Sequence, residues 1–515
     1  MPERPNFLCL VTDQMRADHL GCAGHPVIAT PHLDRLAASG VRFSRAYVNN
    51  PLCMPGRATL FTGLTPRGHG VRSNGIRLDE RLPTATAALA EAGYRTHSVG
   101  KIHLLPYGTP RGVDPATLDP GQWPESAALW QRGALEALPT PYYGLQSVEV
   151  TIGHGPHTDG DYRRWLREQD PQAERLWLPE AGRPTPQGAE AAWHCALPAE
   201  LHYNHWVADR ALAFLEQQPA DQPFFLWCSF PDPHHPYCPP APWASRYHPS
   251  QVPLPTRRPG ELDDLPPFYR LLYEQGFLVS GRRAPTRMED EQLREILALT
   301  YGMISHVDEQ IGRVLAALER RGLGERTVVC FLSDHGDMMG DHWMMNKGPF
   351  HFDGLLRVPF LWSWPGHFPP GRETAGLASL LDFAPTLLDL AGVPIPEGLV
   401  APEPETDRQL APWPGVSLAP VLRGERSSVQ DSVVVENDED YLGLRLRTLV
   451  TDRYQVTAYP GQDYGELFDR EQDPGQLHNR WADPACRELR SELLVRLLER
   501  LVETDNRLPR RVCHA

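Results

Sequence analysis

The sequence has no apolar stretch that approaches the roughly 20 residues a membrane-spanning helix needs. Its first residues, MPERPNFLCLVTDQ, contain no apolar segment of signal-peptide length and no cleavage signal. Nine cysteines are present, but no pair has Cys-x-x-Cys spacing, which argues against a zinc site made of cysteines. Their odd number and irregular spacing are also not typical of a disulfide framework. We therefore expect a reduced, cytoplasmic protein that does not enter a membrane.

An excess of positive charge is also missing. Lys and Arg number 50 against 65 Asp and Glu, and the formal net charge is −15. This balance argues against nucleic acid as the main partner, because phosphate backbones bind to basic surfaces. It does not argue against a small anionic substrate, since a site can be locally basic inside an acidic protein.

The chain is long and rich in proline. Its 515 residues exceed one ordinary core and suit a large domain with a smaller appendage. The 53 prolines are about twice the usual share and predict long, rigid loops.

Short apolar runs alternate with helical patterns. Buried parallel strands are predicted over residues 7–11, 95–100, 224–230, 327–333 and 358–364. Helices are predicted over 30–40, 83–93, 205–217 and 301–322. This alternation indicates an α/β fold with a large mixed, mostly parallel sheet flanked by helices.

The alternating pattern is interrupted in three places and changes near residue 430. Proline-rich or polar inserts at about 105–195, 238–290 and 393–430 are expected to form loops over the edge of the sheet. Two strand-like stretches and a last helix over 486–503 then suggest a small α+β subdomain. We predict a catalytic domain over residues 1–430 and a C-terminal subdomain over 431–515 packed on it.

Polar and charged side chains follow four of the predicted strands. Ligands in open α/β sheets bind beyond the carboxyl ends of the strands. The strand-end residues are Asp13 and Gln14; Lys101 and His103; Asp232, His234 and His235; and Asp334, His335 and Asp337. The oxygens and imidazole of Asp13, Gln14, Asp334 and His335 suit one divalent cation such as Ca²⁺, Mg²⁺ or Mn²⁺. With Lys101, His103, His234 and Lys347 they describe a site for a tetrahedral anion.

The stretch from Cys53 to Arg57 reads CMPGR. Only three residues separate Cys53 from Arg57, whereas a cysteine phosphatase loop needs five. The stretch resembles the C-x-P-x-R signature of the type I sulfatases, part of the alkaline phosphatase superfamily, although most members have Ser where this chain has Gly56. Further segments are similar to the family in the same order: AGYRTHSVGKIHL, PDPHHPY, FLSDHGDMMGDHWMMNKGPFHFDGLLRVPF and GELFDREQDPGQLHNRWADP.

The resemblance implies an alkaline phosphatase-like fold and a sulfuric ester hydrolase. In that family a formylglycine-generating enzyme oxidises the cysteine, here Cys53, to an aldehyde. Its hydrate attacks sulfur near one divalent metal, for which Ca²⁺ is the first expectation, and the aldehyde reforms when sulfate leaves. The implied metal ligands are Asp13, Gln14, Asp334, His335 and the modified Cys53. The other implied roles are Arg57 to orient the hydrate, Lys101 and Lys347 to hold sulfate oxygens, His103 to take a proton, and His234 or Lys347 to meet the leaving oxygen. Apart from the resemblance, Asn74 in RSNGIRL could touch the substrate.

Two alternatives stay open. A formylglycine-dependent phosphonate monoester or phosphodiester hydrolase shares the scaffold, and Gln14 and His335 lean towards it. Lys101 and His103 lean back towards a sulfatase. A catalytically silent binding protein would predict lost ligands, and none is lost.

Other polar residues are weaker candidates. Asn74 precedes a glycine and could simply form a turn. His154, His157, His202, Tyr203 and Asn204 could line a specificity pocket or belong to ordinary loops. Asp337 and Asp341 are expected to brace their loop. The sequence leaves open the identity of the sulfated alcohol and whether the protein is a homo-oligomer.

Overall fold

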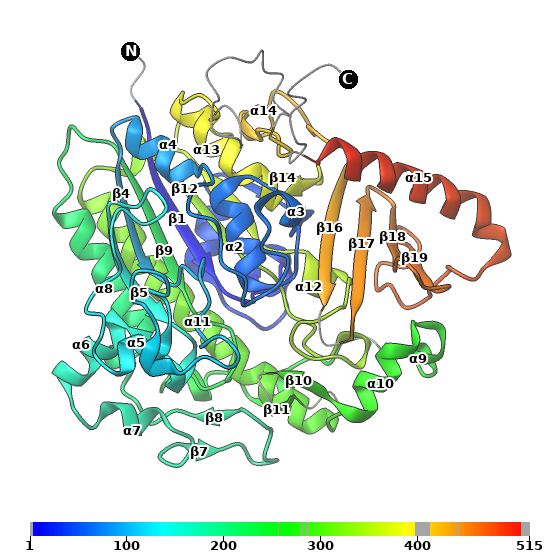
Figure 1. Cartoon of the computed structure of the whole chain (residues 1–515), viewed down its shortest axis with the longest axis horizontal. Helices are drawn as coiled ribbons and strands as arrows, with labels where there is room; N and C mark the ends of the chain where they lie inside the picture. The colour runs from blue at the N-terminus through cyan, green and yellow to red at the C-terminus, as the bar shows by residue number, and fades with distance from the viewer. Residues whose placement is uncertain are drawn as a thin grey trace.

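The computed structural model describes residues 4–255, 257–279, 282–284, 287–396, 413–439 and 442–505 (Figure 1). Its centre is a nine-stranded sheet with the order β14-β2-β13-β12-β1-β9-β4-β5-β6. The strands are β1 (Asn6–Thr12), β2 (Val41–Phe43), β4 (Arg95–Gly100), β5 (Ser147–Ile152), β6 (Asp159–Gly160), β9 (Phe224–Phe230), β12 (Thr327–Ser333), β13 (Phe360–Ser363) and β14 (Arg372–Thr374).

The middle of the sheet is parallel. Strands β12, β1, β9, β4 and β5 run in one direction, which confirms the predicted mixed, mostly parallel sheet. The prediction that residues 358–364 form a further parallel strand was wrong, because β13 is antiparallel to both β12 and β2. A short buried apolar run gives its burial but not its direction.

Helices cover both faces of the sheet. Phe7, Cys9 and Val11 of β1 pack in one core cluster with α2 (Cys53–Thr62), α4 (Ala85–Glu91) and α13 (Phe383–Ala391). Leu8 and Leu10 point to the opposite face and pack with α1 (Pro31–Ala38), α8 (Tyr203–Glu216) and α11 (Asp290–Arg320). Burial on both faces explains why β1 is apolar along nearly its whole length, instead of alternating between apolar and polar residues.

The insert at 105–195 and the segment before residue 301 contain more regular structure than the sequence predicted. The insert at 105–195 supplies β5 and β6, which extend the sheet, and α6 (Asp161–Gln169) packs on them. Helix α11 begins at Asp290, not near 301, because Glu289 and Gln292 form a reciprocal capping box. Residues 397–412 of the insert at 393–430 lie outside the described residues.

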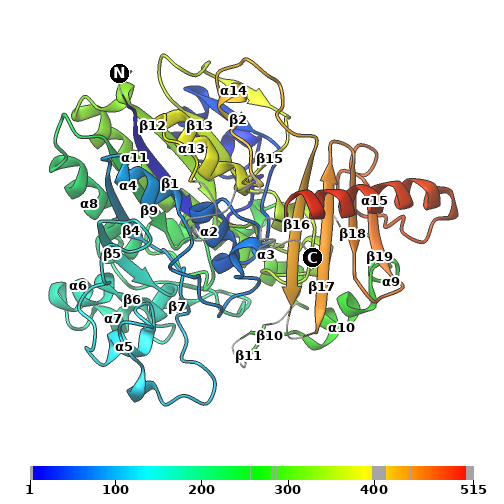
Figure 2. The ribbon, with the colours of Figure 1, turned by 45° about the horizontal axis from the view of Figure 1, so that its top comes forward.

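The C-terminal part forms a separate four-stranded antiparallel sheet (Figure 2). It contains β16 (Ser432–Glu439), β17 (Leu444–Thr451), β18 (Tyr454–Ala458) and β19 (Gly465–Asp469), and α15 (Arg487–Glu503) lies along it. The fold therefore includes the expected small α+β unit, while the boundary at residue 430 stays a prediction.

The cysteines fit a reduced protein. The eight cysteines in the described part of the chain are all free, and Cys9, Cys228 and Cys330 are buried in the strands as predicted. Within the described ranges, no helix is both long and apolar enough to cross a membrane.

Candidate active site

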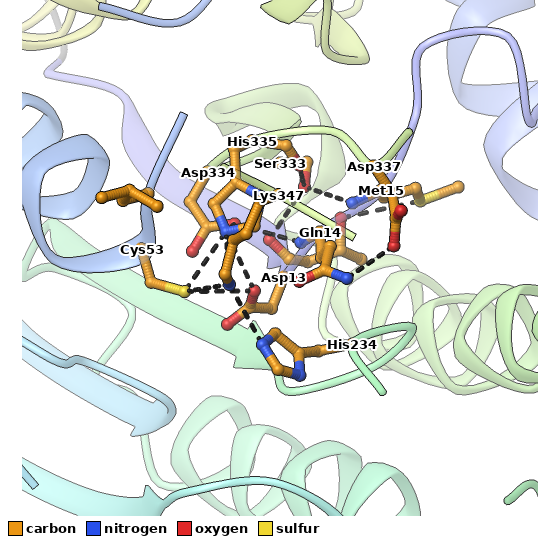
Figure 3. A network of polar contacts seen from close by, with 12 residues as sticks. Asp13, Gln14, Met15, Cys53, His234, Ser333, Asp334, His335, Asp337 and Lys347 are labelled. Carbon is orange, nitrogen blue, oxygen red and sulfur yellow. Dashed lines mark hydrogen bonds and ion pairs between the residues drawn. The ribbon is translucent and has the colours of Figure 1, made fainter. Parts of the chain in front are cut away.

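The carboxyl ends of β1, β4, β9 and β12 meet at one edge of the sheet, where α2 also begins. Asp13, Lys101 and Asp334 follow three of these strands directly, and Cys53 is the first residue of α2. Side chains from these separate segments converge on one point (Figure 3). The strand-end rule therefore brought together residues as far apart in the sequence as Asp13 and Asp334.

The thiol of Cys53 lies at the centre of this point and is 1% exposed. Its Sγ is 2.8 Å from Lys347 Nζ, 3.2 Å from His335 Nε2 and 3.7 Å from Asp13 Oδ1. Burial and Asp13 oppose ionisation, but the charges of Lys101 and Lys347 lower the pKa of Cys53 overall. The side chain is thus held between an ammonium group, an imidazole and a carboxylate.

Gly56 explains one departure from the family motif. A Cβ placed on Gly56 would lie 2.8 Å from the backbone oxygen of Asp334. Glycine thus lets the first turn of α2 approach the end of β12 closely, which seats Cys53 against Asp334 and His335.

Four of the predicted metal ligands belong to one cluster. Ligand atoms of Asp13, Cys53, Asp334 and His335 all lie within 4.8 Å of one another. Burial opposes the charge of Asp13, yet Lys101 and His234 hold its pKa well below the usual range. Two carboxylates and an imidazole are a suitable donor set for a divalent cation.

Gln14 and His335 also fit such an ion. The Nε2 of Gln14 donates to Asp337 Oδ2 at 2.5 Å, while its Oε1 is buried without a partner. His335 donates from Nδ1 to the Gly336 oxygen at 2.8 Å, which leaves the Nε2 lone pair facing the cluster. The unpartnered Gln14 Oε1 and the His335 Nε2, which lies beside Cys53 Sγ and Lys347 Nζ, are both suited to bind a cation.

Arg57 ties the strand ends together and is fully buried. Its Nε donates to Asp334 Oδ2 at 2.7 Å, and one terminal nitrogen donates to the Lys101 oxygen at 2.8 Å and to Ser229 Oγ at 3.0 Å. Its other terminal nitrogen has no hydrogen-bond partner and lies 3.6 Å from Asp13 Oδ2. Arg57 therefore positions the cluster as well as adding charge to it.

Lys347 joins Cys53 to a stack of histidines. Its ammonium contacts His234 Nε2 at 3.0 Å and His335 Nε2 at 3.1 Å. His234 donates from Nδ1 to the His235 oxygen at 2.6 Å, so its Nε2 accepts from Lys347. Although burial opposes the charge, Cys53 and Asp13 raise the pKa of Lys347.

His154 belongs to the site more closely than its sequence context indicated. Its ring stacks on His234 with centroids 3.6 Å apart and an angle of 6°. Its Nε2 lies 3.3 Å from Asp13 Oδ2 and 2.5 Å from Lys101 Nζ. The missed signal is the strand-like stretch 147–152, because His154 follows it just as the other site residues follow their strands.

Lys101 completes the positive charge. Its Nζ is buried and forms an ion pair with Asp13. Lys101 and Lys347 are the only two lysines in the sequence, and both lie in this site. All other permanently charged basic side chains in the sequence are arginines. The restriction of lysine to these two positions is therefore a signal in the composition that indicates the site independently of the motifs.

His103 lies two residues after Lys101 in the segment that follows β4. Its ring stacks on Tyr107 with centroids 3.7 Å apart, and its Nδ1 is buried without a partner. Burial, Lys101 and Arg57 hold the pKa of His103 well below its ordinary value. The imidazole is therefore neutral near pH 7 and able to accept a proton.

The remaining candidates divide into two groups. Asn74 is exposed and accepts from the Met54 nitrogen at 3.0 Å, which places it beside the Cys53 turn. Asp337 and Asp341 brace the loop as expected, through the Met339 nitrogen at 3.0 Å and Arg16 at 2.7 Å. His157 is exposed, and His202, Tyr203 and Asn204 lie in a different buried cluster.

Known proteins resemble the chain over most of its length. An arylsulfatase of Clostridium perfringens is 28% identical over 491 residues, which are 92% of this chain and 90% of the relative. A choline-sulfatase of Rhizobium meliloti is 27% identical over 490 residues, 93% and 83% of the two chains. The solved phosphonate monoester hydrolase of Agrobacterium radiobacter superposes with a TM-score of 0.79 at 28% identity, covering 97% and 96%.

Two family models match the sequence. One, described as N-sulphoglucosamine sulphohydrolase, C-terminal, matches residues 340–503. The other, described as Sulfatase, matches residues 5–393 and so includes every residue of the site. The chain belongs to the sulfatase family, with the alkaline phosphatase-like architecture of that family.

Proposed function

We propose that the protein is a sulfuric ester hydrolase that cleaves sulfate monoesters through a formylglycine formed from Cys53. The observation that supports this most is the position of Cys53 itself. Its Sγ lies 2.8 Å from a lysine ammonium and beside a cluster of two carboxylates and an imidazole. An atom in that position can attack an anion whose charge the lysines neutralise.

Two groups would complete the site. When formed by a formylglycine-generating enzyme, the aldehyde hydrate supplies a nucleophilic oxygen at position 53. A divalent cation, for which Ca²⁺ suits the oxygen-rich ligands best, supplies electrostatic activation of that oxygen. Asp13, Gln14, Asp334 and His335 would hold the cation.

The chain's own residues would then bind the anion and move protons. Lys101 and Lys347 attract and orient the anionic ester, and Lys101 is fully buried, where its charge acts strongly. The Lys347 ammonium, held between Cys53 and His234, is placed to protonate the departing alcohol. The neutral imidazole of His103 is suited to accept the proton released when the aldehyde reforms.

A second function has specific support. The phosphonate monoester hydrolase of Agrobacterium radiobacter shares 28% identity and nearly the whole fold. Sulfate monoesters and phosphonate monoesters each carry one negative charge, so charge alone does not separate them. We place the sulfatase first because Lys101 and His103 supply the pair of groups that the sulfatase signature includes.

Rates on three esters test this order. Metal-loaded enzyme produced with a formylglycine-generating enzyme should be given an aryl sulfate, an aryl phosphonate monoester and an aryl phosphodiester that share one leaving group. We expect the highest kcat/KM for the sulfate ester, and no turnover of any ester by Cys53→Ala. Much faster cleavage of the phosphonate ester would instead assign the protein to the phosphonate hydrolases.

A further inference from the structure

A second cluster of metal-binding side chains lies outside the active site. It is made of His202, Asp232 and His306, whose ligand atoms all lie within 4.8 Å of one another. The three residues are at most 1% exposed. They come from the N-cap of α8, the segment after β9 and the middle of α11 (Figure 1).

The carboxylate of Asp232 has no cationic partner. Its two oxygens accept from the Tyr203 hydroxyl and from Asn204 Nδ2, the latter at 2.7 Å. Among the residues that the structure describes, no lysine or arginine forms an ion pair with it. A buried carboxylate without a cation is costly, and such groups are normally paired or bound to a metal.

Two neighbouring polar atoms are also unsatisfied. Asn204 Oδ1 and His306 Nε2 are buried and have no hydrogen-bond partner. A buried polar atom destabilises the fold when nothing replaces its contact with water. The His306 ring is fixed by stacking on Trp243, with centroids 5.4 Å apart and an angle of 13°. His306 Nδ1 lies 3.5 Å from Asn204 Nδ2, so the Asn204 amide lies beside both Asp232 and His306.

We propose that His202, Asp232 and His306 hold a second divalent ion, of which Zn²⁺ fits best. Two imidazoles and one carboxylate form a borderline ligand set of the kind that zinc prefers, unlike the oxygen-rich catalytic cluster. Asn204 Oδ1 is available as a fourth ligand, which would give a closed, four-coordinate structural site. Zinc–ligand lengths of about 2.0–2.1 Å require ligand atoms about 3.3 Å apart, so modest side-chain rotations would close the site.

A zinc ion bound by these three residues would stabilise the active site without lying in it. It would join α8 and α11 to Asp232, which lies two residues before His234. His234 contacts Lys347 and stacks on His154. The ion would therefore hold the histidine stack without touching substrate.

Metal content measured by mass spectrometry tests the proposal. Purified full-length enzyme, washed with a weak chelating resin, should retain about one zinc per chain in addition to the catalytic ion. Asp334→Asn should lose the catalytic ion and keep the zinc, whereas His306→Gln should keep the catalytic ion and lose the zinc. His205→Gln is a matched control, because His205 lies on α8 three residues after His202 but contacts Arg313 and Asp209 instead.

Two results would overturn the proposal. One is an Asp334→Asn protein that holds no stoichiometric zinc after growth with zinc present. The other is a folded His306→Gln protein, judged by circular dichroism, that holds as much zinc as the unmutated chain. If His306→Gln does not fold, crystals of the unmutated protein decide the matter. Anomalous scattering at the zinc edge should then give a peak among His202, Asp232 and His306, and an empty map would contradict the assignment.

Discussion

In the proposed reaction, single residues of the active site either place positive charge beside the anionic ester or hold the charged groups in position. Lys101 and Lys347 belong to the first kind, because both ammonium groups are directed to the Cys53 and Asp13 side chains. Arg57 belongs largely to the second, since most of its hydrogen bonds join strand ends. These two kinds of residue should respond differently to substitution.

Replacing either lysine should cost most of the activity. Loss of a cation that contacts developing charge costs on the order of 3 kcal/mol, or about a hundredfold in rate. We expect Lys101→Ala and Lys347→Ala each to reduce kcat/KM for an aryl sulfate by at least about that factor. Arg35→Ala, an exposed arginine on α1, is the control and should keep full activity. A loss below about fivefold for Lys347→Ala would contradict its role.

His103 should affect a later step than the lysines do. In the proposed reaction its neutral imidazole accepts a proton after the alcohol has left. His103→Ala should therefore show a rapid release of about one alcohol per enzyme, followed by a slow steady state. Stopped-flow measurement of a coloured alcohol checks this, and a linear time course with an equally low rate would assign His103 to the first step.

At the scale of elements, the segment after β4 is held by one buried carboxyl group. Glu125 Oε1 accepts from the Leu104 and Leu105 nitrogens, both at 3.0 Å, and from Tyr142. This segment carries Lys101 and His103. Burial raises the pKa of Glu125 to about 7.

The raised pKa predicts a pH-dependent effect of Glu125→Gln. Because the folded pKa lies above the unfolded one, stability is highest below the unfolded pKa near 4.5 and falls as pH rises through about 7. The side-chain amide of the Glu125→Gln variant does not ionise, so its contribution to stability does not change with pH. Relative to the unmutated chain, the variant should gain on the order of 2 kcal/mol between pH 5 and pH 8 in denaturant unfolding. Exposed Glu91→Gln serves as control, and a Glu125→Gln difference that is constant with pH would contradict the argument.

Some strands and helix contacts could be predicted from the sequence, and others could not. Strands β1, β9 and β12 could be predicted because each is a mainly apolar run with polar residues after it. The direction of β13 could not, since its burial pattern is the same for either direction. The place of His154 could have been inferred from strand β5, whose mixed burial made it resemble a loop. The relation of His306 to Asp232 depends on helix packing, which no local pattern contains.

Across the whole molecule, the C-terminal sheet supports the loop that leads to Cys53. Asn49 and Asn50 donate to the backbone oxygens of Val434 and Glu436 at 3.0 and 2.8 Å. Val433, Val435 and Val450 pack in the main core rather than in a core of their own. The two sheets are therefore energetically joined, although the sequence pattern distinguishes them.

Removal of residues 431–515 should accordingly prevent folding of the rest. The deletion would expose apolar core surface and remove the hydrogen bonds that buried Asn49 and Asn50 donate to Val434 and Glu436. We expect little soluble protein and no cooperative thermal transition by circular dichroism. A soluble, cooperatively folded fragment of residues 1–430 would show that the C-terminal sheet is an independent appendage.

The central claim is that sulfate ester hydrolysis depends on formylglycine at position 53. Preparations with different degrees of conversion can be made by varying the formylglycine-generating enzyme during expression. In each, peptide mass spectrometry gives the aldehyde fraction at residue 53, and an aryl sulfate gives kcat per chain. We predict that kcat rises in proportion to the aldehyde fraction and falls to zero when only the thiol is present. Full activity in protein whose Cys53 is an unmodified thiol would contradict the account.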